Sequence, residues 1–230
     1  MSNLDQIRRK FNKGCVEYGL LEDGDRILIA LSGGKDSLML CRLLAERSRI
    51  FRPGIQVEAA HVIMDNIPYK SEDGYLERFC RELGITLHIL HSHFDESKDP
   101  RKTKCFLCAW NRRKTLFNFA REQGFNKVAL GHHQDDILTT WLMNITFEGN
   151  ASSMLPRLRM EHYPIDIIRP LCLVQEDWIR DAASELGFAR QKVSCPFEEV
   201  TRRHDINLIF RQLEQMNPEA RYSMWKAMMG

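Results

Sequence analysis

Apolar residues along the chain alternate between short continuous runs and longer runs with a helical period. The continuous runs predict strands at Arg26–Ser32, Val57–Asp65, Ile85–Phe94 and Asn126–His133, and a short extended segment at Ile165–Leu171. The periodic runs predict helices at Leu4–Tyr18, from Lys35 onward, at Glu72–Leu83, at Cys108–Gln123, at Asp135–Phe147 and at Glu176–Leu186. Three of these helices are followed by a glycine stop signal, at Gly19, Gly84 and Gly187.

Strands that alternate with helices imply right-handed βαβ crossovers. We therefore predict an α/β fold with a mostly parallel, twisted sheet and helices on both faces. No linker divides the chain, so residues 1–230 form a single expected domain. It comprises an N-terminal helical segment (1–24), an α/β core (25–195) and a helical C-terminal extension (196–230), because no strand pattern follows Pro196.

The amino-acid composition is typical of a soluble globular protein. The chain has 43% hydrophobic and 28% charged residues, as soluble globular proteins do. No run approaches the roughly 20 apolar residues of a membrane span, and the first residues have no apolar core of the signal-peptide kind. Seven cysteines, an odd number, fit a reducing compartment better than a disulfide framework. We expect a cytoplasmic protein without membrane association.

Ligands of parallel sheets bind beyond the carboxyl ends of the strands. That rule directs attention to Ser32–Ser37, Asp65, His91–Phe94 and His132–Asp136. The first segment, SGGKDS, follows a predicted strand and opens a predicted helix. Its two glycines permit close backbone approach, and the helix start aims N–H groups at an anion. The segment is neither a Walker A motif nor G-x-G-x-x-G, but its chemistry favours phosphate; the alternative is a tight capped turn.

The segment GHHQDD, Gly131–Asp136, follows another predicted strand. Gly131 permits a close turn, and Asp135 and Asp136 fall in the first turn of the next helix. The aspartates either compensate the helix dipole or bind Mg²⁺ beside phosphates, and we favour at least one as a metal ligand. His132 and His133 either contact phosphate or pack inside; the residues alone leave both open.

The cysteines divide into two groups. Cys15, Cys41, Cys80 and Cys172 sit among apolar residues, as small buried side chains do. Cys105 and Cys108 instead place two thiols on one face of a helix start, where cations and the helix dipole favour thiolates. This spacing fits zinc, a redox dithiol or a cluster. Cys195 is the remaining candidate ligand outside an apolar context.

Positive charge surrounds the two thiols. Against the single acid Asp99, the stretch from 98 to 114 carries Lys98, Arg101, Lys102, Lys104, Arg112, Arg113 and Lys114. By itself such a run is most often a solvated surface, and it becomes informative only together with other signals.

SGGKDS resembles the PP-loop of the ATP pyrophosphatases, a superfamily with a Rossmann-like, adenine nucleotide α-hydrolase-like fold that cleaves ATP between its α and β phosphates. The resemblance implies that Ser32, Gly33, Gly34, Lys35, Asp36 and Ser37 bind phosphates, with Lys35 and Asp36 catalytic. It also implies that backbone groups of Ile63 read adenine, that Gly131 and His132 lie at the nucleotide, and that Asp135 and Asp136 hold Mg²⁺.

Cys105, Cys108 and Cys195, together with SGGKDS, GHHQDD and IRPL (Ile168–Leu171), resemble the TtcA-like bacterial tRNA 2-thiocytidine synthetases. In that family three cysteines hold a 4Fe-4S cluster with one iron open to receive sulfur. The stretch NPEARYSMWKAMM is similar to the family's closing helix. The chain is shorter than typical members, and Glu198 stands where many have a further cysteine. The paired terminal zinc-finger cysteines of the tRNA uridine thiolases are missing.

The resemblance implies an ATP-dependent sulfurtransferase that adenylates C2 of a tRNA cytidine and replaces its oxygen with sulfur. Sulfur would be held as hydrosulfide on the cluster or as a persulfide on Cys105 or Cys108. The implied partners are tRNA, a sulfur donor such as a cysteine desulfurase, and a second copy in a homodimer. The tRNA-binding residues we expect are Lys102, Lys104, Arg112, Arg113 and Lys114, extended by basic residues that include Arg202 and Arg203.

Three alternatives stay open at the level of sequence. A PP-loop enzyme could adenylate another acceptor while the thiols bind zinc or act in sulfur transfer. A sulfur-handling paralogue could modify a different nucleotide. A nucleotide-binding module without catalysis is the third, although it would not need both the three thiols and Asp136.

Overall fold

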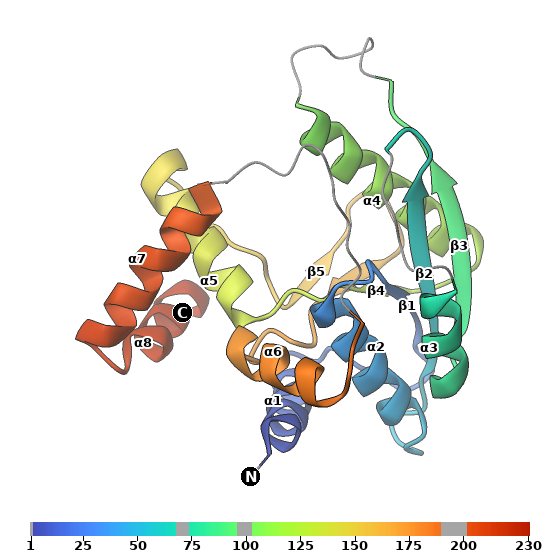
Figure 1. The fold of residues 1–230 in the computed structure, drawn as a ribbon, viewed down its shortest axis with the longest axis horizontal. Helices are drawn as coiled ribbons and strands as arrows, with labels where there is room; N and C mark the ends of the chain where they lie inside the picture. Colours follow the sequence, from blue (N-terminus) through green and yellow to red (C-terminus); the bar gives the residue numbers. More distant parts are fainter. Residues whose placement is uncertain (1, 68–73, 96–102, 190–201) are drawn as a thin grey trace.

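The computed structural model describes residues 2–67, 74–95, 103–189 and 202–230, and their central element is a six-stranded sheet. Its strands are β1 (Arg26–Ala30), β2 (Gln56–Met64), β3 (Thr86–Ser92), β4 (Lys127–Ala129), β5 (Arg157–Arg159) and β6 (Asp166–Ile168). They stand in the order β3-β2-β1-β4-β6-β5 (Figure 1). All neighbouring pairs are parallel except β5 with β6. The predicted α/β class is confirmed.

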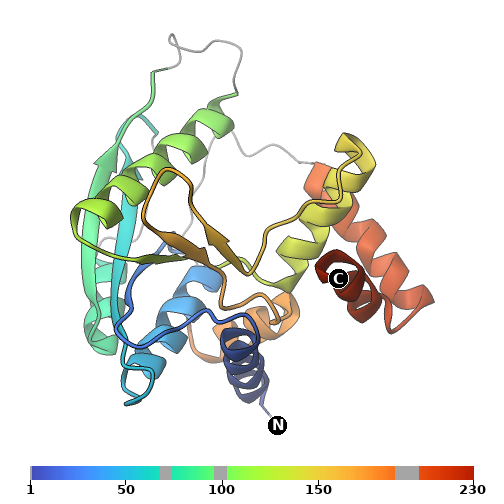
Figure 2. The same ribbon diagram turned by 180° about the vertical axis from the view of Figure 1, so that it is seen from behind.

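Helices cover both faces of this sheet. They are α1 (Asn3–Glu17), α2 (Lys35–Ser48), α3 (Tyr75–Leu83), α4 (Lys104–Glu122), α5 (Gln134–Met143), α6 (Glu176–Glu185), α7 (Arg202–Met216) and α8 (Ala220–Met229). In β1, Ile27 and Ile29 pack with α1, α2 and α6, whereas Leu28 packs with α4 on the other face. Successive strand residues point to opposite faces, so burial of all three shows that both faces are covered. Figure 2 shows α4 lying along its face of the sheet.

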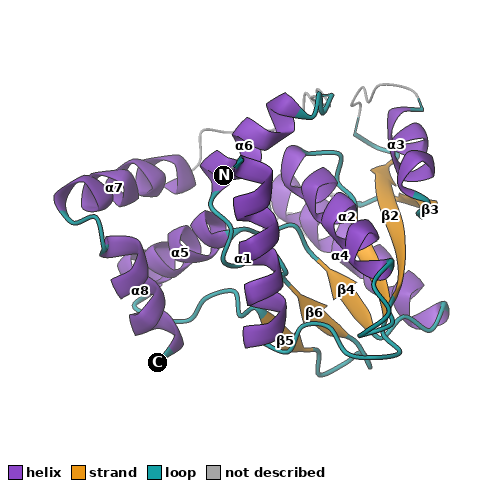
Figure 3. Ribbon diagram, turned by 90° about the horizontal axis from the view of Figure 1, so that it is seen from below, coloured by secondary structure: helices purple, strands orange, loops and turns teal. Residues whose placement is uncertain are grey.

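The helical extension predicted after Pro196 is present as α7 and α8. Both pack against α5, where Phe210 and Trp225 join Ile137 and Leu138 in one apolar cluster. Figures 1 and 3 show α5, α7 and α8 gathered on the side of the molecule away from β2 and β3. Among helices in the described ranges, none is both long and apolar enough to cross a bilayer.

Several boundaries differ from the sequence prediction. Helix α4 begins at Lys104 rather than Cys108, because the Thr103 hydroxyl caps it by accepting a hydrogen bond from the Phe106 N–H at 3.3 Å. The helix predicted over 135–147 changes after Met143 into a π-helical turn at Asn144–Glu148. The antiparallel edge strand β5 was not predicted, since three residues with two arginines carry no strand signal. Glu72 lies outside the described residues.

Candidate functional site

The loop Ser32–Ser37 joins β1 to α2 at the carboxyl edge of the sheet. Gly33 has a φ of +88°, a conformation that favours glycine, and Gly34 is the residue before the helix. Within the described part of the chain no side chain caps α2, which leaves the N–H groups of its first turn available to an anion. The Ser37 hydroxyl donates to the Gly34 carbonyl at 2.9 Å and lies 3.1 Å from the Ser32 hydroxyl. The loop therefore has the form of an anion cradle.

A charged group sits at the base of this loop. Lys35 Nζ lies 3.1 Å from a carboxylate oxygen of Asp36 and 3.1 Å from Oε1 of Glu176 on α6. Burial opposes the charge of Lys35, but these two carboxylates outweigh it and raise the pKa of the ammonium group. Burial also raises the pKa of Asp36, against the opposing attraction of His133 and Lys35. Lys35 is thus a permanent cation beside the cradle.

Gly131 brings the GHHQDD segment against the phosphate loop. A Cβ at this position would lie 3.1 Å from the Ser37 backbone nitrogen and 3.2 Å from the Asp36 carbonyl carbon. Because these are backbone atoms, a side chain would force the two segments apart. The contact also explains why β4 is shorter than predicted, since the chain has to leave the sheet at this point.

The two motif aspartates have different surroundings. Asp135 is buried, and its Oδ1 lies 2.8 Å from Arg221 of α8 while its Oδ2 accepts the Glu176 N–H at 2.8 Å. Asp136 lines the cavity described below, and its Oδ2 accepts the His133 N–H at 3.2 Å. Arg203 of α7 approaches Asp136 Oδ1 to 3.6 Å. Both aspartates therefore contact protein groups, but Asp136 also lines the cavity and Asp135 does not.

Asp36 and Asp136 together form the acidic part of the site. His133 Nε2 stands 3.8 Å from Asp36 Oδ1 and 3.3 Å from Asp136 Oδ2. Repulsion from Asp136 contributes to the raised pKa of Asp36, which is mainly due to burial. Two carboxylates on one cavity wall fit a hard divalent cation such as Mg²⁺, which prefers oxygen ligands.

A cavity of about 330 Å³ opens above the carboxyl ends of β1, β2 and β4, with α4 as its far wall. It is lined by Ala30, Leu31, Ser32, Asp36, Ser37, Ala60, His61, Val62, Arg112, Arg113, Leu116, Leu130, Gly131, His132 and Asp136. An apolar floor with phosphate-binding groups at one end suits a nucleotide. The cavity thus brings together the two motifs that the sequence had placed at this edge.

The register of β2 favours Val62 over the predicted Ile63 as the residue whose main chain contacts adenine. Ile63 is paired with His91 of β3, and it does not line the cavity. Ala60 accepts the Leu31 N–H at 2.9 Å on the β1 side. Main-chain groups of alternate residues point the same way, so those of Val62 face the side where β1 has ended. Val62, which lines the cavity, replaces Ile63 in our account.

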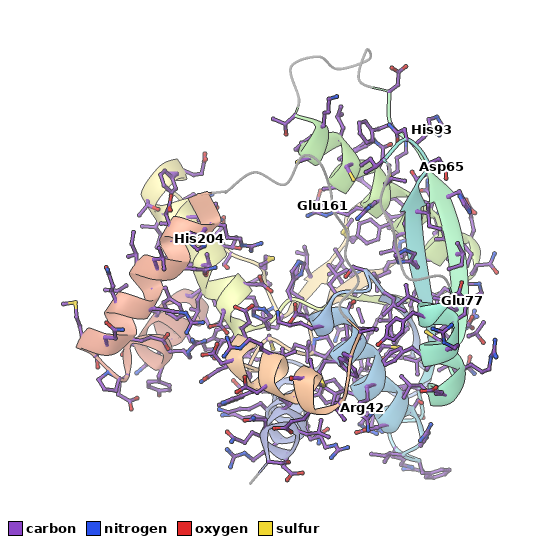
Figure 4. The ribbon with its side chains drawn as sticks, viewed as in Figure 1. Arg42, Asp65, Glu77, His93, Glu161 and His204 are labelled. Atoms are coloured by element: carbon purple, nitrogen blue, oxygen red, sulfur yellow. The ribbon has the colours of Figure 1, made fainter. Side chains whose placement is uncertain are left out.

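The other residues predicted at the carboxyl ends of the strands, Asp65, His91 and His93, lie at the ends of β2 and β3, away from the cavity. Asp65 and His93 stand at the carboxyl ends of β2 and β3 in Figure 4. His91 Nδ1 lies 2.7 Å from Asp65 Oδ1, so these two side chains bind one another. None of the three lines the cavity. The prediction that they lie at the carboxyl edge of the sheet is confirmed, but they lie outside the lining of the cavity.

Several guanidinium groups lie near the imidazole of His132. Burial lowers the pKa of its imidazole to about 4, with Asp136 opposing and Arg169, Arg203 and Arg113 adding to the decrease. The side chain is therefore neutral near pH 7. Among the described residues, neither its buried Nδ1 nor the buried Nε of Arg169 has a hydrogen-bond partner. Orphaned polar atoms beside a cavity are expected where a polar ligand completes the hydrogen bonding.

The thiol pair lies at the start of α4. Cys105 is exposed and Cys108 partly buried, one helical turn apart. The first turn of α4 carries no acidic residue, and the helix dipole favours the thiolate form of both cysteines. The donor set fits a thiolate-bound metal or cluster. Within the described ranges no group of three or more His, Cys, Asp or Glu could hold a metal ion, and Cys195 lies outside them. Cys15, Cys41, Cys80 and Cys172 are buried, as predicted.

The basic residues predicted for tRNA lie at several places. Arg112 and Arg113 line the cavity, while Lys114 Nζ lies 5.0 Å from the centre of the Trp110 ring. Lys104 is exposed in the first turn of α4, and Lys102 lies outside the described residues. Arg203 donates to Thr140 Oγ1 at 3.0 Å beside Asp136.

Sequence reasoning missed Arg169 and Arg221 as individual site residues. Both lay within stretches already singled out, IRPL and NPEARYSMWKAMM, but nothing in their spacing indicated contact with His132 or Asp135. The partners come from positions far apart in the chain, and only the packed fold joins them.

Comparisons with known proteins agree with this geometry. The family model described as a PP-loop domain matches residues 3–190. The chain is 32% identical over 227 residues to a tRNA-cytidine(32) 2-sulfurtransferase of Bdellovibrio bacteriovorus, covering 97% of this chain and 87% of the relative. It is 34% identical to the enzyme of the same name from Geobacter sulfurreducens, covering 99% and 92%.

Among solved structures, the U34-tRNA thiolase NcsA from Methanococcus maripaludis, with its 4Fe-4S cluster, matches with a TM-score of 0.80 at 27% identity, covering 99% of this chain and 78% of that one. An NH3-dependent NAD synthetase from Campylobacter jejuni matches at 12% identity and a TM-score of 0.53, covering 100% and 94%. The second likeness shows the fold alone.

Proposed function

The chain belongs to the PP-loop family and, within it, to the family of the tRNA-cytidine(32) 2-sulfurtransferases, and on that premise we propose that it is an ATP-dependent tRNA thiolase. The reaction adenylates C2 of a tRNA cytidine and replaces its oxygen with sulfur. One observation carries this proposal for the chain itself. The nucleotide cavity is lined by Arg112 and Arg113, and the same helix, α4, presents Cys105 and Cys108.

Adenylation is the task of the cavity. The N–H groups of Ser32–Ser37 hold the β and γ phosphates, and main-chain groups of Val62 meet adenine. The cytidine C2 oxygen attacks the α phosphorus, and the bond from that phosphorus to the bridging oxygen breaks. Pyrophosphate leaves with the electron pair, and Lys35 stabilises its charge. Asp36 and Asp136 are the proposed Mg²⁺ ligands, while Asp135 stays bound to Arg221.

Sulfur then enters at the activated carbon. A sulfur nucleophile attacks C2, the bond from C2 to the adenylated oxygen breaks, and AMP leaves with that oxygen. Cys105, Cys108 and Cys195 would hold a 4Fe-4S cluster, which supplies an iron without a protein ligand for binding sulfur. The neutral imidazole of His132 and the guanidinium of Arg113 line the cavity, and we propose that they donate hydrogen bonds to the phosphate of the departing AMP.

The partners follow from the chemistry. The transferred sulfur requires a donor, and we propose a cysteine desulfurase, which makes persulfide from cysteine. A homodimer and a cytoplasmic site of action complete the proposal, the latter because tRNA is the substrate.

Two measurements on protein purified without oxygen test this function. Iron and sulfide analysis is expected to give about four irons per chain, whereas stoichiometric zinc in a colourless protein would contradict the cluster. Lys35→Ala is expected to lower pyrophosphate release by roughly 100-fold or more, because it removes a charge that stabilises the leaving group. The matched control Lys13→Ala, on the exposed surface of α1, is expected to match wild type. Normal release from Lys35→Ala would remove the loop from the mechanism.

A further inference from the structure

The outward face of α4 carries two aromatic side chains that the mechanism does not use. Phe106 and Trp110 are 48% and 50% exposed, although large aromatic residues normally bury much of their surface. They are four residues apart, and Lys114 follows four residues later, so the three side chains form one row along the helix. Leu107 and Leu116 of the same helix are buried and anchor it to the interior. The row is called the aromatic stripe below and comprises Phe106, Trp110 and Lys114.

The aromatic stripe connects the two parts of the proposed active site. At one end, Phe106 directly follows the exposed Cys105. At the other end, Arg113 is exposed beside Lys114 and also lines the nucleotide cavity. A polymer lying along the stripe would therefore pass from the thiol pair to the mouth of the cavity.

Charge indicates what kind of partner fits this surface. Lys114 Nζ stands 5.0 Å from the centre of the Trp110 ring, and Lys104, Arg112 and Arg113 lie on the same helix. The first acid of α4 is Glu122, in its last turn. A second copy meeting this face symmetrically would bring like charges together, which is unfavourable. A polyanion with flat apolar groups is complementary to it.

The chemistry of the substrate supplies such groups. In a pair with guanine the C2 oxygen of cytosine accepts a hydrogen bond and the base stays in the stack, so the base has to be unpaired before this oxygen can enter the cavity and attack ATP. Proteins recognise unpaired RNA bases by stacking them on aromatic rings next to cations that contact the phosphates.

We propose that the aromatic stripe is the platform on which unpaired bases next to the target cytidine stack. This inference rests on the proposed function and adds the surface that recognises the RNA. Phe106 and Trp110 take base faces, Lys114 takes a phosphate, and the target base continues past Arg113 into the cavity.

Binding of unmodified tRNA to the anaerobically purified protein tests the platform. Trp110→Ala is expected to raise the Kd roughly tenfold, the usual cost of losing one stacked base, and Phe106→Ala is expected to raise it by a similar factor. Trp110→Phe keeps a stacking ring and is expected to stay within about threefold of wild type. The matched control is Phe51→Ala, since Phe51 is 86% exposed with the Arg52 guanidinium 5.8 Å from its ring centre.

Salt dependence separates stacking from phosphate contact. Trp110→Ala is expected to leave the slope of log Kd against log salt unchanged, whereas Lys114→Ala is expected to reduce it by about one.

The protein has four tryptophans, and quenching of their fluorescence by tRNA is expected to be lost in Trp110→Phe. Iron content serves as the check that each variant is folded.

Three results would overturn the platform. The first is an unchanged Kd in both alanine variants while wild type thiolates tRNA, which leaves the proposed function intact. The second is an equal loss in the Phe51→Ala control. The third is a change of Trp110→Ala from dimer to monomer with an unchanged Kd, which would make the stripe a contact between copies. Failure of wild type itself to bind or modify tRNA would instead refute the proposed function.

Discussion

Two neighbouring aspartates show how position within the fold divides their roles. Asp135 and Asp136 follow one another in the first turn of α5, and the sequence treats them alike. A helix turns about 100° per residue, so the first points to α6 and α8 while the second lines the cavity. Arg221, which engages Asp135, is 86 residues away in the sequence. No local pattern could have assigned it.

Substituting each aspartate separately tests this division. Asp136→Asn is expected to lower Mg²⁺-dependent pyrophosphate release by roughly 100-fold, because the cavity loses the charge of a proposed Mg²⁺ ligand. Asp135→Asn is expected to retain most of that activity but to lower the free energy of unfolding by about 2 kcal/mol, because Arg221 loses a charged partner in the interior. Steady-state kinetics and urea unfolding measure both effects. Equal losses of activity in the two variants would contradict the assignment.

Among the secondary-structure elements, α4 shows what the sequence could and could not predict. Its existence and its C-terminal half followed from apolar periodicity. Its first residue was predicted too late, because Cys105 and its basic neighbours carry no helical apolar pattern. The hydroxyl of Thr103 caps the helix and starts it at Lys104. The same holds for the sheet. Long buried strands such as β1 and β2 were predicted nearly to the residue, whereas β5 exists only because β6 offers it an edge to pair with.

The strands are joined at their other ends by an ionic network that the sequence did not reveal. Lys127 of β4 is buried, and its Nζ lies 2.7 Å from Asp25 and 3.0 Å from Glu22. Lys127→Met is expected to lower the free energy of unfolding by about 3–5 kcal/mol, because it removes one partner of a buried ion pair and leaves Asp25 in the interior without its cation. Urea denaturation measures the loss. The control Lys13→Met, on an exposed face of α1, is expected to change it by less than about 0.5 kcal/mol, and equal effects would show that burial of the pair is not the cause.

The network also makes a prediction about pH. Hydrogen bonds from Arg157 and then Lys127 lower the pKa of Glu22 from 4.5 to about 2. The unfolded chain therefore takes up this proton first, and the stability that Glu22 contributes is complete above pH 4.5 and is lost as the pH falls toward 2. Glu22→Gln is expected to lose less stability than wild type over this interval, measured by urea unfolding at a series of pH values. Parallel curves for the two proteins would contradict the contribution.

At the scale of the whole molecule, the C-terminal helices complete a site that the rest of the chain begins. The PP-loop family match ends at residue 190, yet Arg203 and Arg221 of α7 and α8 engage the two motif aspartates. The sequence predicted the sheet, its active edge and a helical extension. It did not predict that the extension packs on α5, since those contacts join residues more than sixty positions apart. As a result, the helix that carries the two thiols also forms one wall of the nucleotide cavity.

The proposed activity of the whole protein is thiolation of a tRNA cytidine at the expense of ATP. Anaerobically purified protein, mixed with unmodified tRNA, ATP, Mg²⁺ and sulfide, provides the direct measurement by mass spectrometry of the digested tRNA nucleosides. We expect 2-thiocytidine to appear only with ATP, with one AMP and one pyrophosphate released for each sulfur inserted, and to be absent with Lys35→Ala or Cys108→Ser. Unchanged cytidine in the wild-type reaction, or sulfur inserted into a different nucleoside, would contradict the account.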